Sequence, residues 1–230
     1  MNQELICELQ LALIPEKSLA DRHVALSKQM ATQYPALITL TGVTARLAFT
    51  PHLTIYQFAL KVKDLDRMCG ALAKVALSAP FALAAMEYRA NANEGSFEVR
   101  YEGVSRLMQF QSEVLAVANP LRDNLLVELN PAGRRFSELI QQSGAIGDNI
   151  RRTGFDAVGD PAQGGTFGPH VTINWFRPGA SVRMNVPDWP PISDFNGQFG
   201  ALGLFVLGPY GTCIQRLASI DLAGSGPARS

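Results

Sequence analysis

The sequence predicts an α+β fold, and three stretches of the chain carry that prediction. A strand-like alternation at residues 4–14 is followed directly by helix-like spacing at 16–33. Residues 81–103 contain two strand-like segments around the turn sequence NANEG, and two more strands follow around GPYGT at 208–212. Short turns join antiparallel strands, whereas parallel strands need long crossovers. Strand pairs interspersed with helices therefore favour α+β over a regular α/β alternation.

The first half of the chain alternates between the strand period and the helix period. Every second residue from Leu5 to Leu13 is leucine or cysteine, which predicts a strand with one buried face, and Pro15 ends it. Helices are expected where apolar residues recur every three or four positions. The expected elements are a strand at 4–14, a helix at 16–33, extended segments at 43–49 and 51–58, and a helix at 65–75 that Asp64 begins.

The second half repeats this mixture. We expect strands at 81–90 and 95–103, a helix at 104–119, short helices at 136–140 and 146–150, a strand at 169–176, and strands at 201–207 and 213–222. The proline-rich segment 178–197 is expected to be a loop. We expect one domain over residues 1–222, and the small polar residues of 223–230 predict a flexible tail.

Composition limits the class of ligand. Lysine plus arginine and aspartate plus glutamate each number 20, so net charge does not favour long nucleic acid or an anionic membrane. The three cysteines, at positions 7, 69 and 213, lack the short spacing of a metal site and suit a reducing compartment. No basic start or long apolar run suggests a signal peptide or a membrane span. We therefore expect a cytoplasmic protein with a small or terminal ligand, no membrane contact and no obligate protein partner.

An octapeptide occurs twice in nearly the same form. PHLTIYQF at Pro51–Phe58 returns as PHVTINWF at Pro169–Phe176, with five identical positions. Given the histidine, the other four identities have a chance probability of about one in 10⁵. Regular alternation on a strand would place Tyr56 on the face of the first histidine, Asn174 on that of the second, and Trp175 on the opposite face.

The repeated residues suit phosphodiester chemistry. Cleavage by water needs a base for the attacking water and an acid for the departing oxygen, and histidine serves in either role near neutral pH. His52 and His170 could share these roles, while the hydroxyls of Thr54 and Thr172 donate hydrogen bonds to the phosphoryl oxygens. No recognised metal-ligand spacing occurs in the chain, so we expect no metal or other cofactor.

The two tetrapeptides His52-Leu53-Thr54-Ile55 and His170-Val171-Thr172-Ile173 resemble the signature of the 2H phosphoesterase superfamily, which includes 2′-5′ RNA ligase-like proteins and cyclic nucleotide phosphodiesterases. The resemblance implies a bilobed, pseudo-two-fold arrangement of two antiparallel sheets with flanking helices, each contributing one motif strand to a central cleft. It also implies hydrolysis of a 2′,3′-cyclic or related phosphodiester, of a small nucleotide or an RNA end, by a histidine acid and base.

Several assignments stay open at the level of sequence. Arg46 and Arg216 could bind phosphate through their guanidinium groups, or could be solvated or ion-paired. Tyr56 could contact a nucleobase or lie in the core. The paired histidines could also be structural, and the motifs do not say which one is the base. The alternative functions are 2′-5′ RNA ligation and non-catalytic binding of nucleotides.

Overall fold

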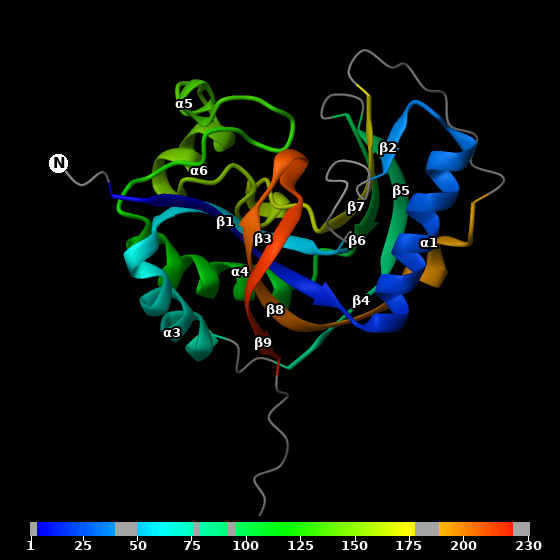
Figure 1. Ribbon diagram of the computed structural model, residues 1–230, viewed down its shortest axis with the longest axis horizontal. Helices are drawn as coiled ribbons and strands as arrows, with labels where there is room; N and C mark the ends of the chain where they lie inside the picture. The colour runs from blue at the N-terminus through cyan, green and yellow to red at the C-terminus, as the bar shows by residue number, and fades with distance from the viewer. Residues whose placement is uncertain (1–3, 40–49, 76–78, 92–94, 178–188, 223–230) are drawn as a thin grey trace, which may run out of the picture.

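A computed structural model describes residues 4–39, 50–75, 79–91, 95–177 and 189–222, and it confirms the α+β fold. The described strands form two antiparallel sheets, with helices packed against both (Figure 1). The extended segment expected at 43–49 and the tail at 223–230 lie outside the described residues.

The larger sheet contains the first octapeptide. Its strands follow the order β3-β1-β8-β4, and β9 pairs with β8. The bounds are β1 Ile6–Pro15, β3 Leu53–Lys61, β4 Phe81–Leu83, β8 Gly197–Leu207 and β9 Cys213–Asp221. The last two strands form the expected closing hairpin through a short 3-10 turn, η6, at Pro209–Gly211.

The smaller sheet contains the second octapeptide. Its order is β2-β7-β6-β5, so β7 lies between two partners. The bounds are β2 Leu37–Thr39, β5 Ala85–Asn91, β6 Ser96–Tyr101 and β7 His170–Phe176. Each sheet therefore carries one motif strand, as the resemblance implied.

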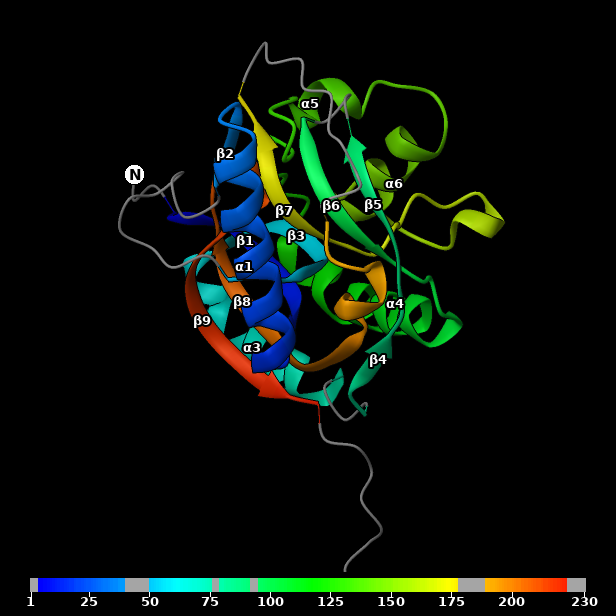
Figure 2. The same cartoon turned by 90° about the vertical axis from the view of Figure 1, so that its right-hand side faces the viewer.

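The helices cover the sheets from outside. In the two views, α1 lies along the smaller sheet, whereas α3 and α4 lie under the larger one (Figures 1 and 2). The α-helices are α1 Lys17–Gln33, α3 Leu65–Val75, α4 Ser105–Ala118, α5 Phe136–Leu139 and α6 Ala145–Thr153. Further 3-10 turns are η1 Val62–Asp64, η2 Asn119–Arg122, η3 Pro161–Gln163 and η5 Ile192–Phe195. None of the helices in the described ranges is long and apolar enough to cross a membrane.

Strand β1 is more deeply buried than its alternation predicts. It lies between β3 and β8, and every residue from Leu9 to Leu13 is buried. Ala12, which should face solvent, packs with Phe205 and Cys213 of the closing hairpin. The expectation of one exposed face was wrong because this hairpin folds back over the second face of the strand.

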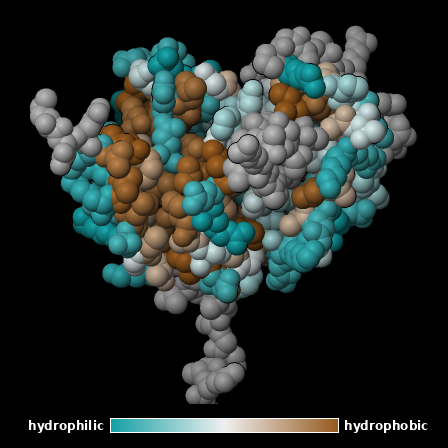
Figure 3. Space-filling view, in the orientation of Figure 1, coloured by the Kyte–Doolittle hydropathy of each residue, from teal (hydrophilic) through white to brown (hydrophobic). Residues whose placement is uncertain are grey.

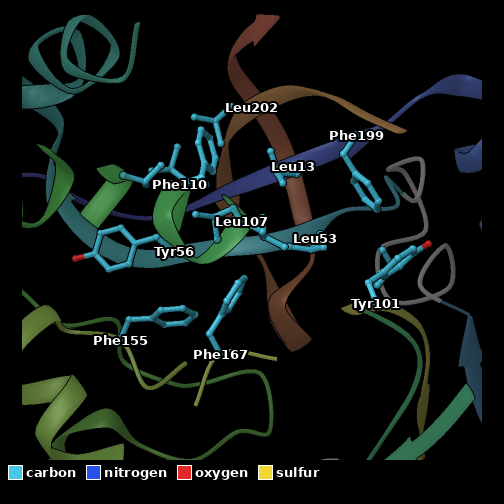
Figure 4. Packing of buried hydrophobic residues seen from close by; sticks show 14 of the residues in the cluster. Leu13, Leu53, Tyr56, Tyr101, Leu107, Phe110, Phe155, Phe167, Phe199 and Leu202 are labelled. Carbon is cyan, nitrogen blue, oxygen red and sulfur yellow. The ribbon is translucent and has the colours of Figure 1, made fainter. Parts of the chain in front are cut away.

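The core joins the two sheets to their helices. Leu107 and Phe110 of α4 pack beside Leu13 and Leu53 of the larger sheet, and all four are at most 2% exposed (Figure 4). Apolar residues also gather on the surface near the start of β1, and the surface dips between the two halves of the molecule (Figure 3). Exposed residues of this kind include Leu5 and Ile6.

His23 is a core residue, as its place on the apolar stripe of α1 suggested. Its side chain is fully buried beside Phe195, and its Nε2 lies 2.8 Å from the hydroxyl oxygen of Tyr101. Burial is the main cause that lowers its pKa from 6.5 to about 3. The folded protein therefore keeps His23 neutral at pH values where the unfolded chain binds a proton.

This difference predicts a loss of stability in mild acid. As pH falls below about 6.5, the unfolded state gains a proton at His23 that the folded state does not take until about pH 3. Between pH 7 and 5 this linkage removes about 2 kcal/mol of unfolding free energy. Urea titrations should show the stability gap between wild type and His23→Gln narrowing by that amount. A gap that stays constant with pH would contradict the prediction.

Candidate active site

The four motif residues meet in one cavity. His52 and Thr54 from β3 and its approach line it together with His170 and Thr172 of β7. The cavity has a volume of ~360 Å³ and lies between the two sheets. Residues far apart in the sequence are thus brought to one site, with a histidine and a threonine from each sheet.

Both histidines are held in the same way. Nδ1 of His52 lies 2.8 Å from the carbonyl oxygen of Thr50, and Nδ1 of His170 lies 2.7 Å from that of Gly168. A carbonyl can only accept, so each Nδ1 carries the hydrogen. In the neutral ring, Nε2 then holds the free lone pair and is the nitrogen available for proton transfer.

The surroundings of the two histidines differ. His52 is 8% exposed, whereas the side chain of His170 is 33% exposed. Burial is the main cause that lowers the pKa of His52 below 6.5, and the positive charge of a protonated His170 lowers it further. Hydrogen bonds to the backbone of Thr50 and Gly211 act in the opposite direction. Burial therefore favours the neutral form of His52.

A β-bulge interrupts both octapeptides at the same position. In the β1–β3 ladder, Thr54 and Tyr56 oppose adjacent residues of β1, so Ile55 is the extra residue. In the β6–β7 ladder, Thr172 and Asn174 oppose adjacent residues of β6, so Ile173 is the extra one. A bulge reverses the side-chain alternation beyond it. The repeat in sequence is therefore also a repeat in backbone geometry.

A helix side chain satisfies the carbonyl of each bulged residue. Nε2 of Gln111 in α4 donates to the carbonyl oxygen of Ile55 at 3.0 Å. Oγ of Ser27 in α1 donates to that of Ile173 at 2.8 Å. Both donors are buried, where an unpaired carbonyl would be costly. Each sheet is thus anchored to its covering helix at the point that sets the direction of the motif side chains.

The bulges overturn three expectations about direction. Tyr56 does not line the cavity; it is fully buried beside Phe155, and its hydroxyl donates to the carbonyl of Thr153 at 2.6 Å (Figure 4). Asn174, which corresponds to Tyr56, is also fully buried and donates to the backbone of α1. Trp175 faces the cavity rather than away from it. Tyr56 is therefore not placed to stack on a substrate.

Of the two arginines proposed from sequence, only Arg216 lies within the described residues. Arg216 is exposed on β9, and its guanidinium carbon lies 5.8 Å from the centre of the Phe205 ring. Arg216 does not line the cavity; its strand β9 pairs with β8, which β1 separates from β3. Arg46 lies outside the described residues.

Other charged residues line the cavity. Arg89 and Arg100 of the smaller sheet and Arg134 of the loop before α5 line the cavity, as does Glu98 of β6. The alternation of Glu98 and Arg100 with apolar neighbours was visible in the sequence. Their place in the site was not, because it depends on the pairing of β6 with β7, which is remote in sequence.

Gly168 has no side chain, and this leaves space for the guanidinium group of Arg100. A Cβ at Gly168 would lie 2.4 Å from Nη2 of Arg100, so a side chain there would displace the guanidinium. The same glycine supplies the carbonyl that holds His170. The glycine-rich approach to the second motif therefore positions a cation and a histidine. Among the described residues, no group of three or more His, Cys, Asp or Glu is arranged to hold a metal ion.

Solved structures share the fold of this chain at low sequence identity. No protein-family model and no curated protein sequence matches the chain. LigT of E. coli in complex with 3′-AMP aligns with 95% of this chain and 99% of its own, at 15% identity and a TM-score of 0.57.

Two further solved structures have the same fold as this chain. The protein TT0787 of Thermus thermophilus aligns at 16% identity and a TM-score of 0.55, covering 95% of this chain and all of its own. A structure described only as a phosphoesterase aligns at 12% identity and a TM-score of 0.57, covering 94% and 99%. The chain therefore has the fold of LigT, the fold that its two His-x-Thr motifs predicted.

Proposed function

We propose that this protein is a phosphodiesterase that hydrolyses a 2′,3′-cyclic or related cyclic phosphodiester without a metal ion. The observation that carries the proposal is the convergence of His52 and His170, each fixed through Nδ1, in one cavity with Thr54 and Thr172. The pair can act as base and acid on the two sides of one phosphorus atom.

The proposed reaction follows from these groups. The neutral histidine accepts a proton from water through Nε2 as the water oxygen attacks phosphorus. The protonated histidine gives its proton to the ribose oxygen as the P–O bond breaks, so that one ring oxygen becomes a hydroxyl and the phosphate becomes a monoester. The two threonine hydroxyls donate hydrogen bonds to the non-bridging oxygens, where negative charge grows in the transition state.

The charge of the cavity and the likeness to LigT support the substrate class. Arg89, Arg100 and Arg134 line the cavity, and guanidinium groups pair well with phosphate oxygens. LigT has been solved with phosphate and with 3′-AMP. The latter carries the kind of 3′-monoester that opening a 2′,3′-cyclic phosphate at its 2′ oxygen would leave.

The test is a substrate panel in excess EDTA. We expect at least one nucleoside 2′,3′-cyclic monophosphate, 3′,5′-cyclic nucleotide or ADP-ribose cyclic phosphate to be converted to a monoester, identified by mass and by the position of the phosphate. Activity that disappears on chelation and returns with a divalent ion would contradict the mechanism. Saturable binding without product would indicate a binding module, and joining of RNA ends in place of hydrolysis would indicate a ligase.

A further inference from the structure

Glu98 is a buried carboxylate beside the second motif. It is 1% exposed, and its Oε1 accepts a hydrogen bond from Oγ of Ser96 at 2.7 Å. The same oxygen lies 3.9 Å from Nε2 of His170. Oε2 lies 3.6 Å from Nη1 of Arg100 and has no hydrogen-bond partner within the described part of the chain. The carboxylate is therefore incompletely satisfied by the groups that surround it.

Burial of such a group demands a compensating charge. An isolated carboxylate costs several kcal/mol to remove from water, and one hydrogen bond from a neutral hydroxyl does not offset that cost. Arg100 is too distant for a direct hydrogen bond. A protonated His170 places a second positive charge at 3.9 Å, so the pair of cations stabilises Glu98 better than Arg100 alone.

Within the described residues, no ion pair joins the first motif to a carboxylate, as one joins His170 to Glu98. The position that faces Thr172 across the ladder is Glu98, whereas the position that faces Thr54 is Ala12. The two half-sites, nearly identical in sequence, therefore differ in charge.

We propose that Glu98 is a positioning residue that holds His170 in its protonated form, so that His170 is the general acid of the hydrolysis and His52 the general base. The assignment of roles rests on the proposed function, whereas the charge difference between the two histidines does not. The lowered pKa of His52 agrees with its role as the base.

The other charged groups around the cavity do not replace Glu98. Those that line it with His170 are Arg89 of β5, Arg100 of β6, His52 at the start of β3, and Arg134 and Asp156 of the adjoining loops. Four of these are cations or become cationic, and they disfavour a proton on His170. Asp156 lies 3.5 Å from Nδ2 of Asn130, and burial raises the pKa of its carboxyl, which disfavours its charged form.

Histidine NMR tests the charge difference without any substrate. The chain has three histidines, so ¹⁵N-histidine labelling gives three imidazoles, which single His→Gln variants assign. In the parent, His170 should titrate at a higher pH than His52. In Glu98→Gln, which keeps the shape and the hydrogen bond from Ser96, the midpoint of His170 should fall by about one to three pH units. Glu113→Gln, an exposed change on α4, is the matched control and should leave it in place.

If Glu98→Gln does not fold, the order in which His52 and His170 titrate in the parent protein still tests the proposal. His52 titrating above His170, or a Glu98→Gln midpoint equal to the parent's, would overturn the proposal. On an active substrate, the alkaline limb of kcat/KM should move to lower pH in Glu98→Gln, because that limb reports loss of the acid's proton. If the parent cleaves nothing but the NMR order holds, the proposed function fails and the charge assignment stands.

Discussion

Replacing either His52 or His170 by asparagine should lower kcat by about 10²- to 10⁴-fold on any cyclic phosphodiester that the protein cleaves, because the loss of a general acid or base, the role proposed for each, has an effect of this size. Asparagine is chosen because its amide can donate to the carbonyl of Thr50 or Gly168, as Nδ1 of His52 or His170 does. The variant therefore keeps the local hydrogen bond and loses Nε2. Steady-state rates and melting temperature, measured together, separate chemistry from folding.

The pH profile identifies which step each histidine serves. In the parent, kcat/KM should follow a bell, and its acid limb should lie below pH 6.5 because burial lowers the pKa of the base, His52. The acid limb should disappear in His52→Asn. His23→Gln changes a histidine that does not line the cavity, so it should keep kcat within about twofold at pH 7. If both cavity variants retain near-parental kcat, the histidine pair does not perform the chemistry.

The elements of the fold could be predicted because each carries a local signal. The helix expected at 16–33 is α1 at Lys17–Gln33. The strand expected at 81–90 is divided: Phe81–Leu83 forms β4 and pairs with β8 in the larger sheet, whereas Ala85–Asn91 forms β5 and pairs with β6 as expected. The exposure of β1 could not be predicted, because its second face is covered by Phe205 and Cys213, which follow almost two hundred positions later. Periodicity indicates which residues prefer burial, but it does not show which distant segment of the chain covers them.

In each motif strand, the direction of the side chains could be predicted from sequence only for the residues that precede the bulge. His52, Thr54, His170 and Thr172 precede the bulged isoleucine of their strand, and the cavity brings them together as expected. Beyond the bulge, regular alternation fails, and Gln57 and Trp175 take the cavity-facing places. Isoleucine is an ordinary strand residue, so the identity of Ile55 or Ile173 does not predict a bulge.

The motif threonines give the second large effect. Thr54→Val and Thr172→Val keep a β-branched side chain of similar shape and remove one hydroxyl each. If the hydroxyls stabilise charge on the phosphoryl oxygens, each substitution should lower kcat by about 10²- to 10³-fold, the usual loss for one oxyanion donor. Both residues are half-buried on the cavity wall, and neither hydroxyl forms a hydrogen bond with another residue of the described ranges. Melting temperature should therefore change little.

The double variant shows whether the two hydroxyls act on one phosphate. If they do, Thr54→Val combined with Thr172→Val should lose less than the product of the single losses, because groups that act as a unit are not additive. Thr32→Val is the matched control: this exposed threonine of α1 bonds to the backbone of its own helix, so kcat should not change. If the cavity variants keep parental kcat, or if they unfold where Thr32→Val does not, then the threonines are structural. The shared octapeptide would in that case preserve the paired bulges rather than a pair of phosphate ligands.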